Sequence, residues 1–185
     1  MLILLLRGWS NAGKDTAATI LQEQDPLFVR FAFADRLKEM VAERYGGSLA
    51  ALNTQEGKQA ICPYVGVPWR QLLLRVGADE RGRNPDVFAE ATADSIAPLR
   101  LAVAAKVVIT DWRYPNEYDV IRRRFPDADI RTVWVRRVDQ DVSPVEHFNE
   151  TLLINRTGDY ELINPSSLAG LRLSVAALVN HLKHL

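Results

Sequence analysis

The chain has 185 residues, 48% of them hydrophobic and 25% charged, which is the composition expected of one globular domain with a full hydrophobic core. Its formal net charge is zero, so no overall field would draw it to nucleic acid or to an anionic membrane, and we expect neither as a partner. A single cysteine, Cys62, excludes an internal disulfide and any metal site built from several cysteines.

Apolar and β-branched runs predict strands along the chain, and apolar residues at helical spacing predict helices. In chain order we expect strand 2–6, helix 13–24, strand 27–33, helix 35–45, helix 69–76, helix 84–97, strand 106–110, helix 117–125, strand 130–135, strand 160–163 and a last helix from about residue 166. Gly77 marks the expected end of one helix, and Asn84 is the expected cap of the next. Residues 48–67 show no regular pattern.

The first apolar run, Met1 to Leu6, is far too short to span a bilayer. It also lacks the charged start and the cleavage site of a signal peptide. Together with the single cysteine, this favours a protein of the reducing cytoplasm.

Strands separated by helices imply one parallel sheet with helices on both faces, which is an α/β fold of three layers. We expect about five strands in this sheet. Ligands of such folds bind beyond the carboxyl ends of the strands. The residues just after Leu6, Phe33, Thr110 and Val135 should therefore gather in one crevice.

A phosphate-binding loop follows the first strand, because Gly8 to Lys14 has the spacing G-x-x-x-x-G-K. Glycines let the backbone wrap around phosphate oxygens, and the amides at the start of a helix point at the anion. The strand before the motif and the helix after it distinguish it from a glycine turn without a ligand. The residues expected to hold the nucleotide are Gly8, Ser10, Asn11, Ala12, Gly13, Lys14, Asp15 and Thr16.

Asp15 stands where such loops usually carry a Ser or Thr whose hydroxyl meets Mg²⁺. A carboxylate beside a triphosphate is repulsive unless a metal or a substrate hydroxyl compensates it. Asp15 could therefore hold the metal, directly or through water, or face the second substrate. Alternatively, Asp15 has no ligand and is only an acidic residue stabilised by the dipole at the start of the helix. The hydroxyl of Thr16 would then meet the metal.

Asp111 ends the predicted strand 106–110, which is the position of an acid that orients Mg²⁺ or its water. Arg113 should lie near the same crevice, where a guanidinium can neutralise charge on a transferring phosphoryl group. The alternative for Arg113 is a surface salt bridge with Glu117.

Several motifs occur in a fixed order over nearly the whole chain. They are Gly-Lys-Asp-Thr at 13–16, Phe-Ala-Asp-Arg-Leu-Lys at 33–38, Arg70-x-Leu-Leu with Gly77 and Arg81, Ile-Thr-Asp-Trp-Arg-Tyr-Pro-Asn-Glu at 109–117, Arg136-Arg137, His147-x-x-Glu150, and Asp159-Tyr160 leading to Asn164. In this order they resemble the bacteriophage-type deoxynucleoside monophosphate kinases, which are P-loop NTPases. The Asp-x-Arg-x-Pro-Asn-Glu stretch is the most specific of them.

The resemblance implies a P-loop kinase fold and transfer of a phosphoryl group from ATP, with Mg²⁺, to a deoxynucleoside 5′-monophosphate. It implies a single domain over 1–185, an acceptor-binding helical region at about 35–100, and a host cytoplasm if the protein is viral. The segment 136–155 is polar, and we expect it to close over the nucleotide as a lid.

The resemblance also assigns roles to individual residues. Lys14, Asp15, Arg113 and Arg137 would be catalytic, and Asp15, Thr16 and Asp111 would hold the metal. The acceptor would be bound by Asp35, Lys38, Arg70, Arg81, Asp111, Glu117 and Glu150.

Two other functions stay open at this point. One is a kinase of the same fold for another phosphorylated acceptor, such as phosphomevalonate or dephospho-coenzyme A. The other is a nucleotide-binding switch, against which the acceptor-side arginines speak, since a switch needs no second phosphate site. The preferred base, the sugar, the donor nucleotide and a homodimeric state are also open.

Overall fold

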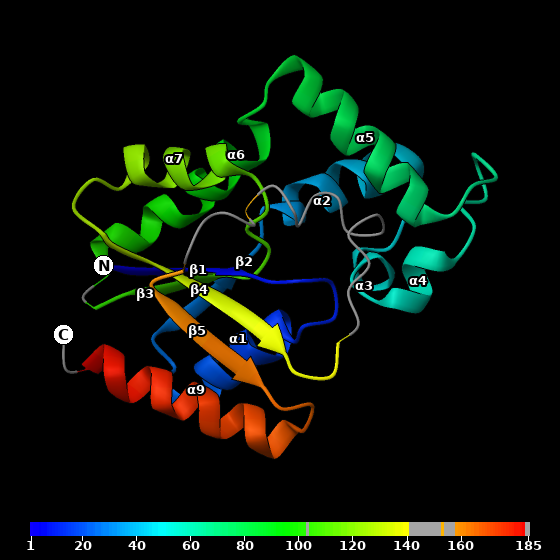
Figure 1. Ribbon diagram of the computed structural model, residues 1–185. Helices are drawn as coiled ribbons and strands as arrows, with labels where there is room; N and C mark the ends of the chain where they lie inside the picture. The colour runs from blue at the N-terminus through cyan, green and yellow to red at the C-terminus, as the bar shows by residue number, and fades with distance from the viewer. Residues whose placement is uncertain (103, 141–152, 154–157, 184–185) are drawn as a thin grey trace.

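The structure is a computed structural model, and it describes residues 1–102, 104–140, 153 and 158–183. Five strands form one parallel sheet in the order β2-β3-β1-β4-β5 (Figure 1). The strands are β1 (Leu2–Arg7), β2 (Phe28–Phe31), β3 (Lys106–Ile109), β4 (Asp129–Arg137) and β5 (Tyr160–Asn164). This confirms the expected parallel sheet and the position of each predicted strand.

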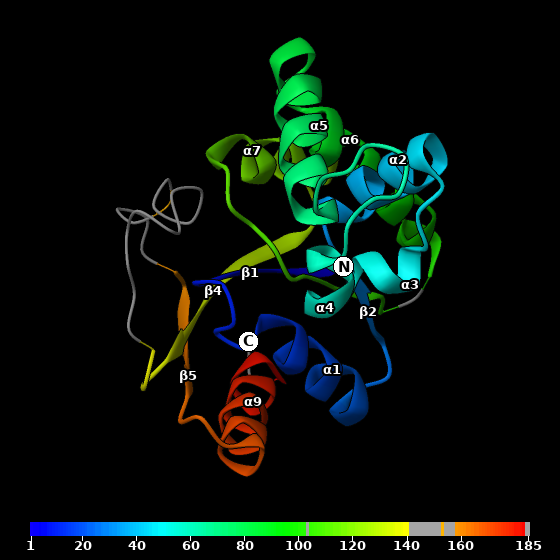
Figure 2. The ribbon, with the colours of Figure 1, turned by 90° about the vertical axis from the view of Figure 1, so that its right-hand side faces the viewer.

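Helices cover both faces of the sheet and make three layers (Figure 2). The α-helices are α1 (Lys14–Gln24), α2 (Ala34–Tyr45), α3 (Leu49–Leu52), α4 (Gln55–Gln59), α5 (Trp69–Arg83), α6 (Val87–Ile96), α7 (Pro115–Arg124) and α9 (Leu168–Lys183), and η1 (Ala97–Leu101) is a 3-10 helix. Helices α1 and α9 lie on one face, and α2, α5, α6 and α7 lie on the other. None of the described helices is long and apolar enough to cross a membrane.

The two faces of the sheet carry two separate hydrophobic clusters, and β1 contributes to both. Ile3 and Leu5 belong to the cluster beneath α2 and α5, whereas Leu4 and Leu6 belong to the cluster beneath α1 and α9. All four side chains are fully buried. A strand covered on both faces needs apolar residues at every position, which explains the continuous apolar run. Cys62 is buried as well.

Two local predictions were wrong. Helix α5 continues through Gly77 to Arg83, because a glycine there lets α5 approach α2; a Cβ at Gly77 would lie 3.1 Å from Cδ2 of Leu37. Helix α6 begins at Val87 with Asp86 at its N-cap position, so Asn84 caps only the turn before the helix, where its Oδ1 accepts a hydrogen bond from the Asp86 amide (3.0 Å). The segment 48–67 contains the short helices α3 and α4, too short for periodicity to reveal.

Candidate active site

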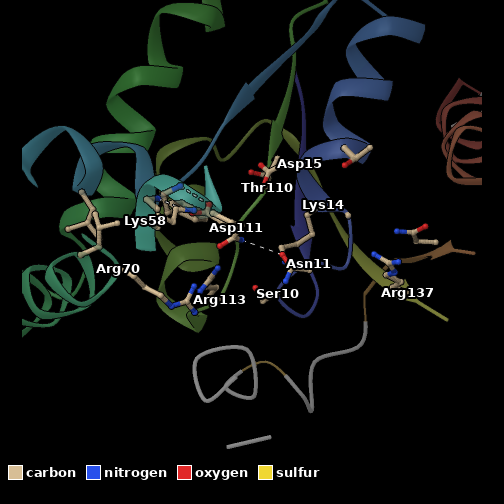
Figure 3. A pocket seen from close by; sticks show the side chains of 18 of the residues that line it. Ser10, Asn11, Lys14, Asp15, Lys58, Arg70, Thr110, Asp111, Arg113 and Arg137 are labelled. Carbon is tan, nitrogen blue, oxygen red and sulfur yellow. Dashed lines mark hydrogen bonds between the residues drawn. The ribbon is translucent and has the colours of Figure 1, made fainter. Parts of the chain in front are cut away.

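A cleft of about 940 Å³ lies where the strands end (Figure 3). Its lining includes residues that follow or end each of the five strands: Ser10, Ala34, Asp111, Arg137 and Asn164. The expectation that the carboxyl ends of the strands form one crevice is therefore confirmed. Every residue discussed below is placed relative to this cleft.

The phosphate loop depends on two glycines whose backbone other residues rarely adopt. Gly8 has φ +149° and Gly13 has φ +96°. A Cβ at Gly8 would lie 2.3 Å from the carbonyl oxygen of Val135, and a Cβ at Gly13 would lie 2.7 Å from Nδ2 of Asn164. Asn164 in turn donates a hydrogen bond to the Ala12 carbonyl (2.9 Å), so the end of β5 holds the loop in shape.

Lys14 lies over the loop with its side chain largely buried. Its Nζ donates hydrogen bonds to the carbonyl oxygens of Gly8 (2.7 Å) and Trp9 (2.8 Å). These contacts hold the ammonium group at the mouth of the loop, in the cleft lining, where an anion bound by the loop amides would meet it.

Asp15 lines the cleft one residue further on, with an exposed carboxylate. Arg30, from β2, pairs with it through Nη2 at 3.2 Å and with Asp35 through Nη1 at 3.1 Å. Although the carboxylate is accessible from the cleft, desolvation by the surrounding walls works against its ionisation. A hydrogen bond from Thr110 and the charge of Arg30 outweigh this effect, so the pKa of Asp15 is lowered. Asp15 is thus a carboxylate held ionised at the edge of the loop.

Asp111 ties the end of β3 to the start of α2. Its two carboxylate oxygens accept hydrogen bonds from the backbone amides of Phe33 (2.7 Å) and Ala34 (2.9 Å). Each oxygen keeps a further lone pair, so this bridge leaves room for a contact to a hydrated metal ion.

Glu117 is buried. The alternative role for Arg113, a salt bridge with Glu117 on the surface, therefore does not apply. Oε2 of the Glu117 carboxyl group accepts hydrogen bonds from the backbone amides of Arg113 (2.8 Å) and Tyr114 (3.0 Å). Burial and the nearby charge of Asp111 raise the pKa of Glu117 to about 8. The residue therefore fixes the backbone that presents Arg113 to the cleft.

The predicted acceptor residues fall into two groups. Arg70, Arg81 and Arg113 line the cleft. The guanidinium of Arg81 lies over the rings of Phe88 and Tyr114, 4.7 and 4.4 Å from their centroids. The described residues that line the cleft do not include Asp35 and Lys38, which form an ion pair of 3.1 Å with each other.

Arg137 lies on the opposite side of the cleft from Arg70 and Arg113, with Lys14 between them (Figure 3). Its Nε pairs with Asp139 at 2.8 Å and donates to the Ser166 hydroxyl at 3.3 Å. The cleft lining on this side continues through Ser166, Ser167, Leu168 and Leu171. Glu150 and nearly all of the expected lid 136–155 beyond residue 140 fall outside the described residues.

Two basic residues of the site were missed. Lys58, from α4, lines the cleft, and Arg30 links Asp15 to Asp35. No motif surrounds either residue, and 48–67 showed no pattern that could have indicated which way Lys58 points. Only the packing of α4 and β2 against the rest of the chain brings them to the site.

The donor set suits Mg²⁺ that arrives with a nucleotide. Among the residues that the structure describes, no group of three His, Cys, Asp or Glu side chains could hold a metal by itself. Mg²⁺ usually takes one or two carboxylates together with substrate phosphates and water. Asp15, Thr16 and Asp111 all line the cleft beside Lys14, so the expected metal residues fit such an ion.

Neither a protein-family model nor a curated protein sequence matches the chain. Solved structures match it over nearly their whole length. Dephospho-CoA kinase from Campylobacter jejuni matches with a TM-score of 0.56 at 8% identity, over 97% of this chain and 96% of that chain. TT1252 from Thermus thermophilus matches with a TM-score of 0.51 at 17% identity, over 98% and 97%.

The tunicamycin resistance protein of Deinococcus radiodurans matches similarly, with a TM-score of 0.51 at 13% identity, over 96% of this chain and 95% of that chain. At such identities the likeness concerns the fold alone. The five-stranded parallel sheet between helices is the P-loop kinase fold, and the expected fold class is confirmed.

Proposed function

We propose that the chain transfers the terminal phosphoryl group of ATP to a deoxynucleoside 5′-monophosphate and releases the diphosphate. The observation that carries this proposal is a single cleft with two cationic sides. The phosphate loop with Lys14 lies in its middle, Arg70 and Arg113 line the acceptor side (Figure 3), and Arg81 also lines the cleft. A nucleotide-binding switch would have no use for the second set of cations.

On the donor side, the loop amides from Ser10 to Thr16 bind the phosphates of ATP, and Lys14 exchanges its contacts with the loop carbonyls for phosphate oxygens. The donor nucleoside then extends toward Asn164 and Leu171, away from the acceptor arginines. Glycines at positions 8 and 13 keep the backbone close enough for this contact.

At the point of transfer the chain supplies position and charge, and no covalent intermediate is needed. Mg²⁺ bound with the nucleotide would neutralise the phosphate oxygens, held by Asp15, Thr16 and Asp111. Arg113 stabilises the charge that builds up on the transferring group, because Glu117 fixes its backbone at the cleft.

The choice of a deoxynucleotide acceptor is supported by the motif around Arg113. Within it, Glu117 binds two backbone amides, and Asn116 donates to Asp86 (2.8 Å) and to the Pro85 carbonyl (3.0 Å), which joins α7 to the start of α6. The stretch that most resembles the deoxynucleoside monophosphate kinases is thus the part that shapes the acceptor wall.

The test is an acceptor screen that follows ADP release with ATP and Mg²⁺. The acceptors are the four deoxynucleoside monophosphates, the ribonucleotides, phosphomevalonate and dephospho-coenzyme A. We expect turnover with one or more deoxynucleoside monophosphates, reduced roughly 10²- to 10³-fold in Lys14→Ala and in Arg113→Ala. Arg75→Ala, on the exposed face of α5, is the matched control and should behave as the unmodified protein.

Other outcomes lead to different conclusions. Turnover with only phosphomevalonate or dephospho-coenzyme A would contradict the deoxynucleotide acceptor and still support phosphoryl transfer from ATP. Slow ATP hydrolysis that no acceptor accelerates would contradict phosphoryl transfer to a small molecule and favour a switch.

A further inference from the structure

The short helix α4 is fixed by contacts within its own segment and by one hydrogen bond to the phosphate loop. Thr54 caps it, since its hydroxyl accepts a hydrogen bond from the Gly57 amide (2.9 Å). Gln55 donates through Nε2 to Oδ1 of Asn11 in the phosphate loop (3.3 Å). Gly57 packs so tightly that a Cβ there would lie 2.1 Å from the Ala51 carbonyl oxygen. The side chains of α4 that face the cleft are therefore positioned by the fold.

Lys58 is the basic side chain that α4 contributes to the cleft lining. It lies on the same side as Arg70 and Arg113 (Figure 3). In the part of the chain that the structure describes, no hydrogen bond or ion pair satisfies Lys58 or Arg70. Lys38, also near, is already paired with Asp35.

The electrostatics agree with this geometry. Burial lowers the pKa of Lys58, and the positive charges of Lys38, Arg70 and Arg113 lower it further, while the charge of Asp15 opposes them. Lys58 is half-buried, and a positive charge that loses part of its hydration beside other cations is unfavourable in the unliganded protein. A dianion bound among them removes this penalty.

We infer that Lys58, together with Arg70, binds the 5′-phosphate of the acceptor monophosphate. This inference rests on the proposed function and adds a residue to it. The phosphates of ATP have Lys14 and the loop amides, whereas Lys58 lies with Arg70 on the acceptor side. The hydrogen bond between Gln55 and Asn11 joins the helix that carries Lys58 to the phosphate loop.

A residue that grips a phosphate throughout the reaction contributes to binding and leaves the barrier of the bound complex nearly unchanged. One charge-assisted hydrogen bond contributes enough that its loss should raise the KM for the acceptor about 10- to 100-fold. We therefore expect Lys58→Met to raise this KM by that factor, with kcat within about threefold and the KM for ATP unchanged.

The experiment measures both KM values and kcat for Lys58→Met, for Lys58→Arg, which keeps the charge, and for Gln59→Met, an exposed neighbour on the same helix. Lys58→Arg should recover most of the acceptor affinity, and Gln59→Met should match the unmodified protein. An unchanged acceptor KM in Lys58→Met overturns the inference. So does a loss confined to kcat, since it would place Lys58 at the transferring group.

A second measurement separates this inference from the proposed function. With a non-hydrolysable ATP analogue in the phosphate loop, inorganic phosphate is titrated into each variant by calorimetry. We expect binding that weakens at least tenfold in Lys58→Met and not in Gln59→Met. Equal binding in both variants overturns the role of Lys58. Turnover with another phosphorylated acceptor but with no deoxynucleoside monophosphate, by contrast, would contradict only the identity of the acceptor.

Discussion

At the residue scale, Glu117 makes the stability of the fold depend on pH. Its pKa is about 8 in the folded protein, against 4.5 for an ordinary glutamate. Between these values the folded state binds a proton that the unfolded state has released. The free energy of unfolding therefore falls as pH rises through this window, by at most about 1.4 kcal/mol per pH unit.

Glu117→Gln should remove this slope, because the amide does not titrate and its oxygen can still accept the two backbone hydrogen bonds. Relative to the unmodified protein, the variant should gain stability between pH 5 and pH 8. Urea unfolding at several pH values measures this difference. Asp119→Asn, on the exposed side of α7, is the control, and parallel curves for Glu117→Gln and the unmodified protein would contradict the assignment.

Arg30 acts on two carboxylates at once, Asp15 beside the phosphate loop and Asp35 at the start of α2. Arg30→Met should leave Asp15 without its cation, lower kcat on the order of tenfold, and lower the free energy of unfolding by about 1 kcal/mol. In Arg30→Lys the single ammonium group cannot pair with both carboxylates in the same way. Its kcat and its free energy of unfolding should lie between those of Arg30→Met and the unmodified protein.

The control for Arg30 is Arg36→Met, which removes only the exposed pairs with Glu39 and Glu43. Steady-state kinetics and thermal unfolding of these variants test the prediction. If Arg30→Met and Arg36→Met have the same kcat, Arg30 has no role in positioning Asp15.

At the element scale, two glycines of α5 differ in how closely other side chains pack around them. A Cβ at Gly82 would meet nothing within 4 Å, whereas at Gly77 it would lie 3.1 Å from Leu37 and 3.2 Å from Arg81. Gly82→Ala should therefore raise the free energy of unfolding by about 0.5–1 kcal/mol through helix propensity alone.

Gly77→Ala should lose that gain, because Leu37 and Arg81 must move. We expect it to be at least about 1 kcal/mol less stable than Gly82→Ala by chemical unfolding. Equal stability of the two variants would mean that α5 and α2 are not packed closely at this position.

At the scale of the whole molecule, the strand order divides the cleft into two halves. β1 lies in the middle of the sheet and carries the phosphate loop. β2 and β3, on one side, lead to Arg30, Asp111 and Arg113, and β4 and β5, on the other, lead to Arg137 and Asn164. This order explains why Arg137, at the end of β4, lies apart from Arg113, which comes after β3.

Much of the fold and the centre of the site could be predicted from local sequence. Apolar runs indicated all five strands, and the glycine spacing indicated the phosphate loop with Lys14. Helix ends were less reliable, since Gly77 looks like a stop signal and serves packing instead. The site residues from Gly8 to Thr16 lie together because they are consecutive, and this is why the motif revealed them.

By itself the sequence determined the strands, the order of the elements and the phosphate loop, because each depends on residues close together along the chain. Only the tertiary structure decided which polar residues share the cleft. Asn164 supports Ala12 from 152 residues away, Glu117 is buried, and Lys58 reaches the site from a five-residue helix. Such placements depend on long-range packing. The residue type alone does not tell whether a side chain is buried, faces the cleft or is exposed.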